Sequence, residues 1–270
     1  MGLLRKRLLN GEARLGVWGL GYIGFSTMAN FAVNGVSCLG TDISKPTVEA
    51  VNAGQVPVPN LDEWLGFPVK PLVDSGMMRA TLNWRDLINN GVAVHMIAVP
   101  TERGDEPWDG ALVDVVAKIA ENDPPESDVD RPLIVIESTL TPNRTDQVVI
   151  PIFEKAGLRV GRDLLLGVAP RRDWFISRGM SLKNLPRIVG GVSPEATAAM
   201  IDVLGVVCDH LVPATDHRHA ELVKSVENAY RHIDIAFANQ LSLAFPSLDV
   251  REVLRLAATK WNIGRYSPSF

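Results

Sequence analysis

Cysteine, histidine and long apolar runs are scarce in this chain of 270 residues. It contains two cysteines, Cys38 and Cys208, and five histidines. Two cysteines cannot form a disulfide framework or the paired spacing of a zinc site, so we predict no metal ion and two buried thiols within strands. The apolar runs have the length of strands, which argues against a membrane span.

An excess of charge of either sign is missing as well. The chain has 27 Lys and Arg against 31 Asp and Glu, a net charge of -4, which argues against nucleic acid as a partner. The basic start of the chain is superficially like a targeting segment. However, Lys6 stands where a myristoylation signal needs Ser or Thr, and no apolar core long enough for secretion follows. We therefore predict a cytoplasmic protein in which residues 1–12 are an exposed extension.

A glycine-rich turn is the most informative feature of the sequence. It follows a short apolar run at 14–18, precedes residues suited to a helix, and contains Gly19, Gly21, Tyr22, Ile23 and Gly24. In a dinucleotide cradle the first glycine permits the tight turn, the second lets the backbone approach a pyrophosphate, and the third lets the helix pack on the strand. The amino end of the helix then faces the phosphates.

An acidic residue ends the next predicted strand. Asp42 follows the run at 36–41 and lies 18 residues after Gly24, close to the spacing at which an acid binds the adenosine ribose. A carboxylate there repels a 2′-phosphate, so the predicted cofactor is NAD rather than NADP. The alternative, a glycine-rich turn without a ligand, is less favoured because the strand, helix, second strand and acid all occur in order.

Strands and helices alternate from the glycine turn to Pro213. This alternation predicts an α/β fold of the Rossmann type at 13–213, a doubly wound, mostly parallel sheet with helices on both faces. Loops at the carboxyl ends of such strands border the ligand. The loop at 100–108, which starts with Pro100 and Thr101, is therefore predicted to border the cofactor, and Glu137 and Thr139 lie at the carboxyl end of a later predicted strand.

The pattern changes after Pro213. Residues 216–243 have apolar positions at helical spacing and no strong breaker, which predicts a helix of about 40 Å. With a shorter helix at 249–258, it would form a second, all-α domain at 214–270 whose carboxyl end looks incomplete.

Lys224 and Asn228 lie four residues apart on this helix and therefore share a face. A partly desolvated lysine could accept a proton or stabilise an alkoxide, while the amide holds a substrate hydroxyl. The alternative is that Lys224 pairs with Glu221 or Glu227 on a solvated face.

Six segments in order resemble nucleotide-sugar dehydrogenases of the UDP-glucose/GDP-mannose dehydrogenase family. Members of that family oxidise the C6 hydroxyl of a nucleotide sugar to a carboxylate with two NAD. The segments are spread over nearly the whole chain: Gly19 to Gly24, Asp42-Ile43, Val99-Pro100-Thr101, Glu137-Ser138-Thr139, Val189 to Val192 and Glu221 to Asn228.

The resemblance implies roles for these residues. The three glycines and Asp42 would hold NAD, with Pro100, Thr101, Glu137 and Thr139 near its nicotinamide half. Thr139 would position a catalytic water, Lys224 and Asn228 would stabilise oxyanions at C6, and Tyr266 would line the sugar pocket. The second domain would be like that of 6-phosphogluconate dehydrogenase, with the 216–243 helix as the core of a homodimer. UDP-hexoses, UDP-N-acetylhexosamines and GDP-mannose are all compatible substrates.

The chain departs from the family pattern in three places. Arg171 stands where the family has a glutamate that serves thioester hydrolysis, and a guanidinium cannot act as a base. Residues 55–61 lack the usual Glu-Pro-Gly. The family's nucleophilic cysteine and UDP-binding domain follow the segment that matches 266–270, where this sequence stops. Because thioester chemistry needs a thiolate, we predict that this chain binds NAD but does not complete the four-electron oxidation alone.

Two other functions are compatible with the sequence. A two-electron dehydrogenase of the 3-hydroxyacid or 6-phosphogluconate type would also use Lys224 and Asn228, and Arg171, Arg172 and Arg178 would then bind an acidic substrate. Those arginines could equally belong to a solvated loop. The third possibility is a non-catalytic NAD-binding module.

Overall fold

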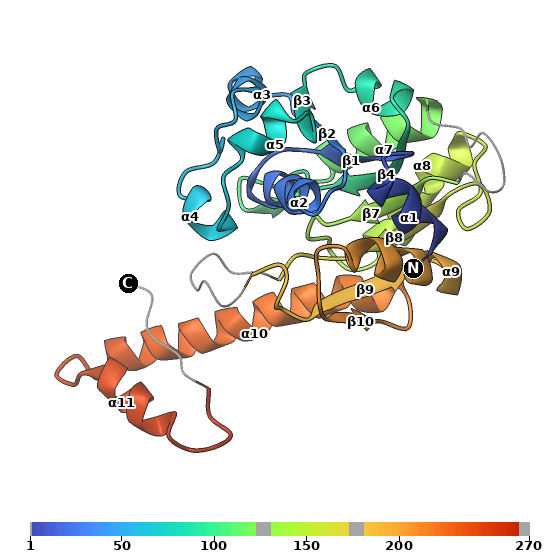
Figure 1. The fold of residues 1–270 in the computed structure, drawn as a ribbon. Coiled ribbons are helices and arrows are strands. Elements are labelled where there is room, and N and C mark those ends of the chain that lie inside the picture. Colours follow the sequence, from blue (N-terminus) through green and yellow to red (C-terminus); the bar gives the residue numbers. More distant parts are fainter. Residues whose placement is uncertain (1, 123–130, 173–180, 265–270) are drawn as a thin grey trace. The chain divides into compact units, whose positions relative to one another are not determined.

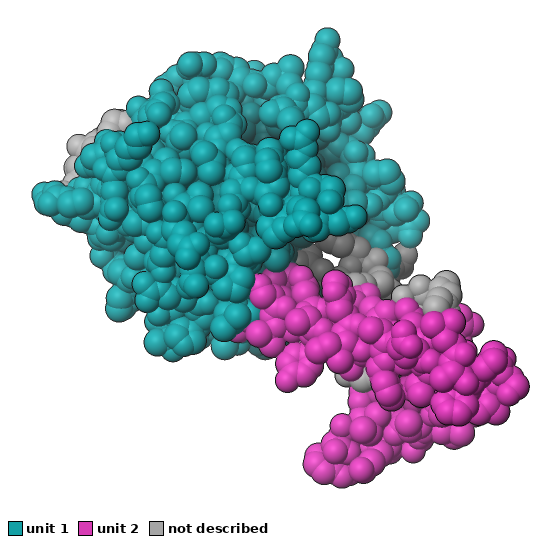
Figure 2. All heavy atoms as spheres, turned by 180° about the vertical axis from the view of Figure 1, so that it is seen from behind, with its two compact units in different colours: residues 1–222 teal, residues 223–270 magenta. Residues whose placement is uncertain are grey.

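The computed structural model describes residues 2–122, 131–172 and 181–264. The chain forms two compact units, residues 1–222 and residues 223–270, which Figure 2 shows in two colours.

Unit 1 is built on a sheet of eight strands in the order β10-β9-β8-β7-β4-β1-β2-β3. All neighbouring strands are parallel except β8 and β9. This arrangement confirms the predicted doubly wound α/β fold (Figure 1). The strands are β1 (Arg14–Trp18), β2 (Cys38–Thr41), β3 (Met78–Thr81), β4 (Val92–Ile97), β7 (Leu133–Ile136), β8 (Leu165–Val168), β9 (Arg187–Gly191) and β10 (Leu211–Pro213), and β5 (Glu102–Arg103) pairs separately with β6 (Glu106–Pro107).

Apolar side chains cover both faces of this sheet, as expected for parallel strands enclosed by helices. On β7, Leu133 and Val135 enter one apolar cluster while Ile134 and Ile136 enter the other. The first cluster includes side chains of α1, α2, α3 and α9, and the second includes side chains of α6, α7 and α8. The helices are α1 (Leu3–Leu9), α2 (Tyr22–Val33), α3 (Lys45–Asn52), α4 (Asp62–Leu65), α5 (Lys70–Asp74), α6 (Arg85–Asn89), α7 (Gly110–Asn122), α8 (Ile150–Lys155), preceded by the π-helical η1 (Thr145–Val149), and α9 (Pro194–Leu204).

The N-terminal residues are not the exposed extension that the sequence predicted. They form α1, whose Leu8 is fully buried in the first apolar cluster. The backbone amides of Gly2 and Arg5 donate hydrogen bonds to the carboxylate of Asp202 on α9, at 2.6 and 3.2 Å. Burial of an apolar side chain and neutralisation of a helix amino end by a carboxylate both stabilise this docking.

Only one of the two cysteines lies in a strand, although the sequence predicted a strand position for both. Cys38 lies in β2, as expected, but Cys208 lies in the turn after α9, where its amide donates to the carbonyl of Leu204 at 2.9 Å. Burial raises the pKa of both thiols. Neither cysteine therefore supplies a thiolate near neutral pH.

Unit 2 contains most of α10 (His217–Ala244) and all of α11 (Val250–Ala257). The carboxylate of Asp249 caps α11 by accepting hydrogen bonds from the amides of Arg251 and Glu252. Ala238, Val250 and Leu254 form its small core. Within the described residues, no helix combines the length and apolarity needed to cross a bilayer.

Candidate functional site

The glycine turn between β1 and α2 depends on the absence of side chains at two positions. Gly19 has a φ of 87°, and a Cβ there would lie 2.5 Å from the carbonyl oxygen of Ala98. A Cβ on Gly24 would lie 1.8 Å from the carbonyl oxygen of Gly19. Only glycine therefore allows the turn to close and α2 to start directly against it.

Gly21 leaves space in front of the amino end of α2. It is the N-cap residue, no side chain caps the helix, and an added Cβ would meet nothing within 4 Å. The first amides of a helix lack partners within the helix and favour an anion. The backbone at Gly21 therefore offers room and hydrogen-bond donors to a phosphate group.

Asp42 connects the glycine turn with the end of β2. Its carboxylate accepts hydrogen bonds from the amide of Leu20 at 2.7 Å and from the amide of Ser44 at 2.8 Å. These bonds hold the side chain beside the turn, and each oxygen keeps further acceptor capacity. Asp42 is thus placed to accept hydrogen bonds from ribose hydroxyls.

A cavity of about 520 Å³ opens beside the turn at the carboxyl ends of β1, β2 and β4. Strand order reverses between β1 and β4, which is where open α/β sheets bind ligands. The volume is typical of a small-molecule site. Six predicted cofactor-binding residues line it, namely Gly19, Gly21, Tyr22, Ile23, Asp42 and Pro100.

The sequence did not single out Trp84, Asp114 and Lys118, three side chains that line this cavity. Trp84 contacts the cations of Arg85 and Lys118, at 4.4 and 5.5 Å from its ring, and Lys118 also pairs with Asp114. Spacing carries no signal for them, because Trp84 and Lys118 come from separate helical segments. Trp18, which also borders the cavity, is 1% exposed and donates a hydrogen bond to His95 at 3.0 Å.

The loops after β4 and β7 are joined by hydroxyl groups. The Ser138 hydroxyl accepts from the amide of Val99 at 3.0 Å and donates to its carbonyl at 2.8 Å. The Thr101 hydroxyl donates to the carbonyl of Thr139 at 2.5 Å. The side chain of Thr139 is exposed at the carboxyl end of β7. Thr101 and Thr139 are therefore brought together, although neither lines the cavity.

Glu137 and Arg171 lie in the interior, in an ion cluster that also contains Arg187. The Glu137 carboxylate accepts hydrogen bonds from Arg187 and, at 2.7 Å, from the hydroxyl of Thr27. Arg171 lies 3.9 Å from Glu137 and donates to the hydroxyls of Ser26 and Thr27 on α2. The cluster thus connects α2 with the ends of β7, β8 and β9.

Burial in this cluster argues against direct ligand contact by either side chain. Glu137 is 2% exposed and Arg171 is 4% exposed. Buried charges require partners, and the partners of these two residues are other side chains of the protein. Arg172 is half-buried, donates to the carbonyl of Pro186 at 2.7 Å, and remains a predicted substrate-binding residue. Arg178 and Tyr266 lie outside the described residues.

The first turns of α10 are anchored within unit 1 by buried polar contacts. The Glu221 carboxylate accepts from the amides of Asn143 and Thr145, at 2.8 and 2.9 Å. Asp146 contacts His217 and Arg218. Partial burial opposes ionisation of Asp146, but hydrogen bonds from those two side chains hold the pKa of its carboxyl below the usual value.

Lys224 and Asn228 belong to unit 2 and lie four residues apart on α10. Lys224 is half-buried and Asn228 is exposed. The Glu221 carboxylate accepts hydrogen bonds from the backbone at 143 and 145, which disfavours its pairing with Lys224. These contacts do not bear on the other predicted partner of Lys224, which is Glu227. Across the described residues, no three His, Cys, Asp or Glu side chains are grouped as metal ligands.

Family models match both parts of the chain. The NAD-binding domain of the UDP-glucose/GDP-mannose dehydrogenase family matches residues 13–205, and the central domain of that family matches residues 218–269.

Individual proteins show the same similarity. The UDP-N-acetyl-D-mannosamine dehydrogenase of Pyrococcus horikoshii is 30% identical over 263 residues, which are 94% of this chain and 60% of that protein. The enzyme of the same name from Salmonella typhi is 30% identical over 90% of this chain and 58% of its own length. This chain therefore spans about three fifths of the length of these relatives.

Solved structures resemble the fold over nearly the whole chain. The UDP-N-acetyl-mannosamine dehydrogenase of Staphylococcus aureus superposes with a TM-score of 0.81 at 28% identity, covering 95% of this chain and 61% of that one. A GDP-mannose dehydrogenase from Pseudomonas aeruginosa, at 21% identity, shares the fold with a TM-score of 0.79 over 94% of this chain and 58% of its own.

Proposed function

Because the chain belongs to the UDP-glucose/GDP-mannose dehydrogenase family, we propose that it takes part in the NAD-dependent oxidation of the C6 hydroxyl of a nucleotide sugar. The observation that carries this proposal is the cavity where the glycine turn, Asp42 and Pro100 meet. The space in front of Gly21 fits the pyrophosphate of NAD, and the Asp42 carboxylate fits the ribose hydroxyls as a hydrogen-bond acceptor. A carboxylate at that position disfavours the 2′-phosphate of NADP.

The substrate that we propose is a UDP-N-acetylhexosamine of the N-acetylmannosamine type. Three relatives of 29 to 30% identity, each matched over at least 90% of this chain, carry that substrate in their names. The proposal rests on this overall similarity of sequence.

In this proposal the chain supplies groups that stabilise charge on the reacting oxygen and a group that positions a water molecule. NAD, when bound, accepts a hydride. The Lys224 ammonium stabilises negative charge on the C6 oxygen, and the Asn228 amide donates a hydrogen bond to the same oxygen. Thr139, whose backbone is held by Thr101, positions a water for the second oxidation. Arg171 is one of the three arginines that favoured an acidic substrate, and its burial weakens the 3-hydroxyacid alternative.

Alanine at Lys224 or at Asn228 tests these roles in the protein that contains this chain. Loss of one group that stabilises an oxyanion lowers turnover by about 100-fold or more. We expect that loss in NADH formation with UDP-N-acetyl-D-mannosamine, together with unchanged NAD affinity. Lys155→Ala, at an exposed lysine on α8, is the matched control and should keep full activity.

Three results would contradict the proposed function. Full turnover in both alanine variants would remove Lys224 and Asn228 from the mechanism. Oxidation of small 3-hydroxyacids but of no nucleotide sugar would favour the two-electron dehydrogenase. Binding of NAD without turnover of either substrate class would favour the non-catalytic module.

We also propose that α10 forms the core of a homodimer. Val226, Tyr230, Ile233 and Phe237 follow helical spacing along one face and are 41%, 68%, 64% and 59% exposed. A continuous apolar face of this kind indicates an interface.

The dimer is tested by light scattering. The 29.4 kDa chain is expected to show about twice that mass, and the double variant Tyr230→Glu, Phe237→Glu is expected to be a monomer. His232→Glu, an exposed polar position on the opposite face, should stay dimeric; a monomeric unmodified chain would contradict the proposal.

A further inference from the structure

A second hollow in unit 1 lies at the opposite ends of the strands that carry the glycine turn. Its volume is about 600 Å³, within the range of small-molecule sites. It borders the amino ends of β1, β2 and β3, where Arg14, Cys38 and Met78 begin their strands. Gly19 and Asp42 follow the carboxyl ends of β1 and β2, so this hollow is separate from the cofactor cavity.

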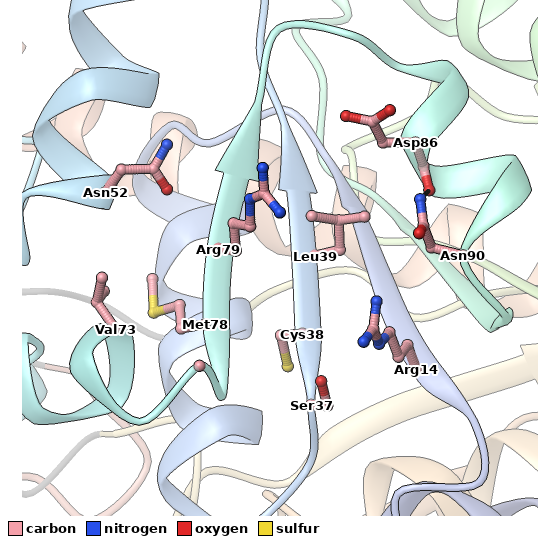
Figure 3. A pocket seen from close by; sticks show the side chains of 11 residues that line it. Arg14, Ser37, Cys38, Leu39, Asn52, Val73, Met78, Arg79, Asp86 and Asn90 are labelled. Carbon is pink, nitrogen blue, oxygen red and sulfur yellow. Dashed lines mark hydrogen bonds between the residues drawn. The ribbon is translucent and has the colours of Figure 1, made fainter.

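The hollow is open because little covers this face of the sheet. Helix α6 has five residues, of which Leu87 alone is buried. Leu39 and Arg79 are partners in the parallel register of β2 and β3, so both side chains lie on the same face. Figure 3 shows Arg79 and Arg14 on either side of Leu39, which is 6% exposed.

Arg14 and Arg79 are the cations of this hollow, and neither is neutralised by a described residue. No hydrogen bond or ion pair joins their side chains to any described part of the chain. The nearby carboxylate of Asp86 instead accepts hydrogen bonds from Thr81 and Asn83, at 2.6 and 2.9 Å.

The amide groups of the hollow are also engaged. The Asn52 side chain donates to the carbonyl of Ala80 at 2.9 Å and accepts from its amide at 2.8 Å. The Asn90 side chain donates to the carbonyl of Asp86 at 2.6 Å. The two guanidinium groups are therefore the main unused donors around this space.

Protection of the sheet edge does not account for both arginines. Charged side chains on an edge strand oppose pairing with another chain, and Arg79 lies on the edge strand β3. Arg14, however, lies on β1, which is flanked by β2 and β4. A cation on an inner strand, at the rim of a hollow floored by Leu39, needs another explanation.

We propose that this hollow binds a small molecule carrying an oxyanion, a phosphate or a carboxylate, through Arg14 and Arg79. Guanidinium groups bind such oxyanions through two parallel N–H donors, and Leu39 supplies an apolar floor. The proposal is independent of the function assigned to the cofactor cavity.

Calorimetric titration of the chain with pyrophosphate and, separately, with citrate tests the proposal. Saturating NAD is present throughout, so that the glycine turn does not contribute binding. Pyrophosphate represents the phosphate class and citrate the carboxylate class. We expect at least one of them to bind, and Arg14→Gln and Arg79→Gln each to weaken that binding by about tenfold or more. Arg251→Gln, at an exposed arginine of unit 2, is the matched control.

The outcomes separate the proposal from general attraction between charges. Weakening in the two hollow variants but not in Arg251→Gln supports it, and the probe that binds identifies the ligand class. Equal weakening in all three variants would show nonspecific attraction and overturn it, as would the absence of binding by both probes. Thermal unfolding of each variant verifies the fold, which we expect to persist because both arginines are exposed.

Discussion

Replacement of Glu137 by glutamine is expected to destabilise unit 1 by about 3 to 5 kcal/mol. The substitution keeps the shape of the side chain but removes the carboxylate that pairs with both Arg171 and Arg187. Breaking a buried ion cluster by removing one partner leaves uncompensated charge in a medium of low dielectric constant, which is the main cost. The measurement is urea unfolding, in which the midpoint should fall while the slope remains unchanged.

Two further variants isolate the effect of the buried charge. Glu49→Gln removes an exposed carboxylate that lies 3.6 Å from Lys45, and should cost less than about 1 kcal/mol. Adding Arg171→Met to Glu137→Gln removes one of the two buried guanidinium groups that faced Glu137 and should restore part of the lost stability. If Glu137→Gln behaves like Glu49→Gln, the cluster does not hold α2 against the sheet.

Alanine at Gly24 and alanine at Gly21 are expected to impair NAD binding for different reasons. A Cβ on Gly24 would overlap the carbonyl oxygen of Gly19, so α2 or the turn must move. Overpacking of this kind costs about 1 to 3 kcal/mol, so both stability and NAD affinity should fall. A Cβ on Gly21 meets no protein atom but stands where the phosphates approach the helix, so only NAD affinity should fall, by about tenfold or more.

Thermal unfolding and NAD titration of the two variants together distinguish these effects. The Gly21 variant also serves as the control for Gly24, because it adds the same methyl group to the same turn without overlap. Unchanged NAD affinity in Gly21→Ala would show that the pyrophosphate does not pass this position, and would contradict the assignment of the cofactor cavity.

The cofactor cradle is the part of the molecule that local sequence predicts best. Gly19, Gly21, Gly24 and Asp42 lie within 24 consecutive residues of the β1-α2-β2 unit. The glycines act through the backbone, and the Asp42 carboxylate is held by amides of the same unit. The alternation of strand and helix in the rest of unit 1 is also a local property, since it follows from apolar periodicity. For these features the chain needs no distant partner to define its conformation.

The direction of single polar side chains could not be predicted in the same way. Arg171 hydrogen-bonds to Thr27 across 144 residues, and Thr27 hydrogen-bonds to Glu137 across 110 residues. The docking of α1 on Asp202 and the lining of one hollow by Arg14 and Arg79 likewise involve segments far apart in the chain. Whether such groups face a ligand or one another depends on which distant strands and helices become neighbours. Periodicity, which describes only adjacent residues, carries no information about that choice.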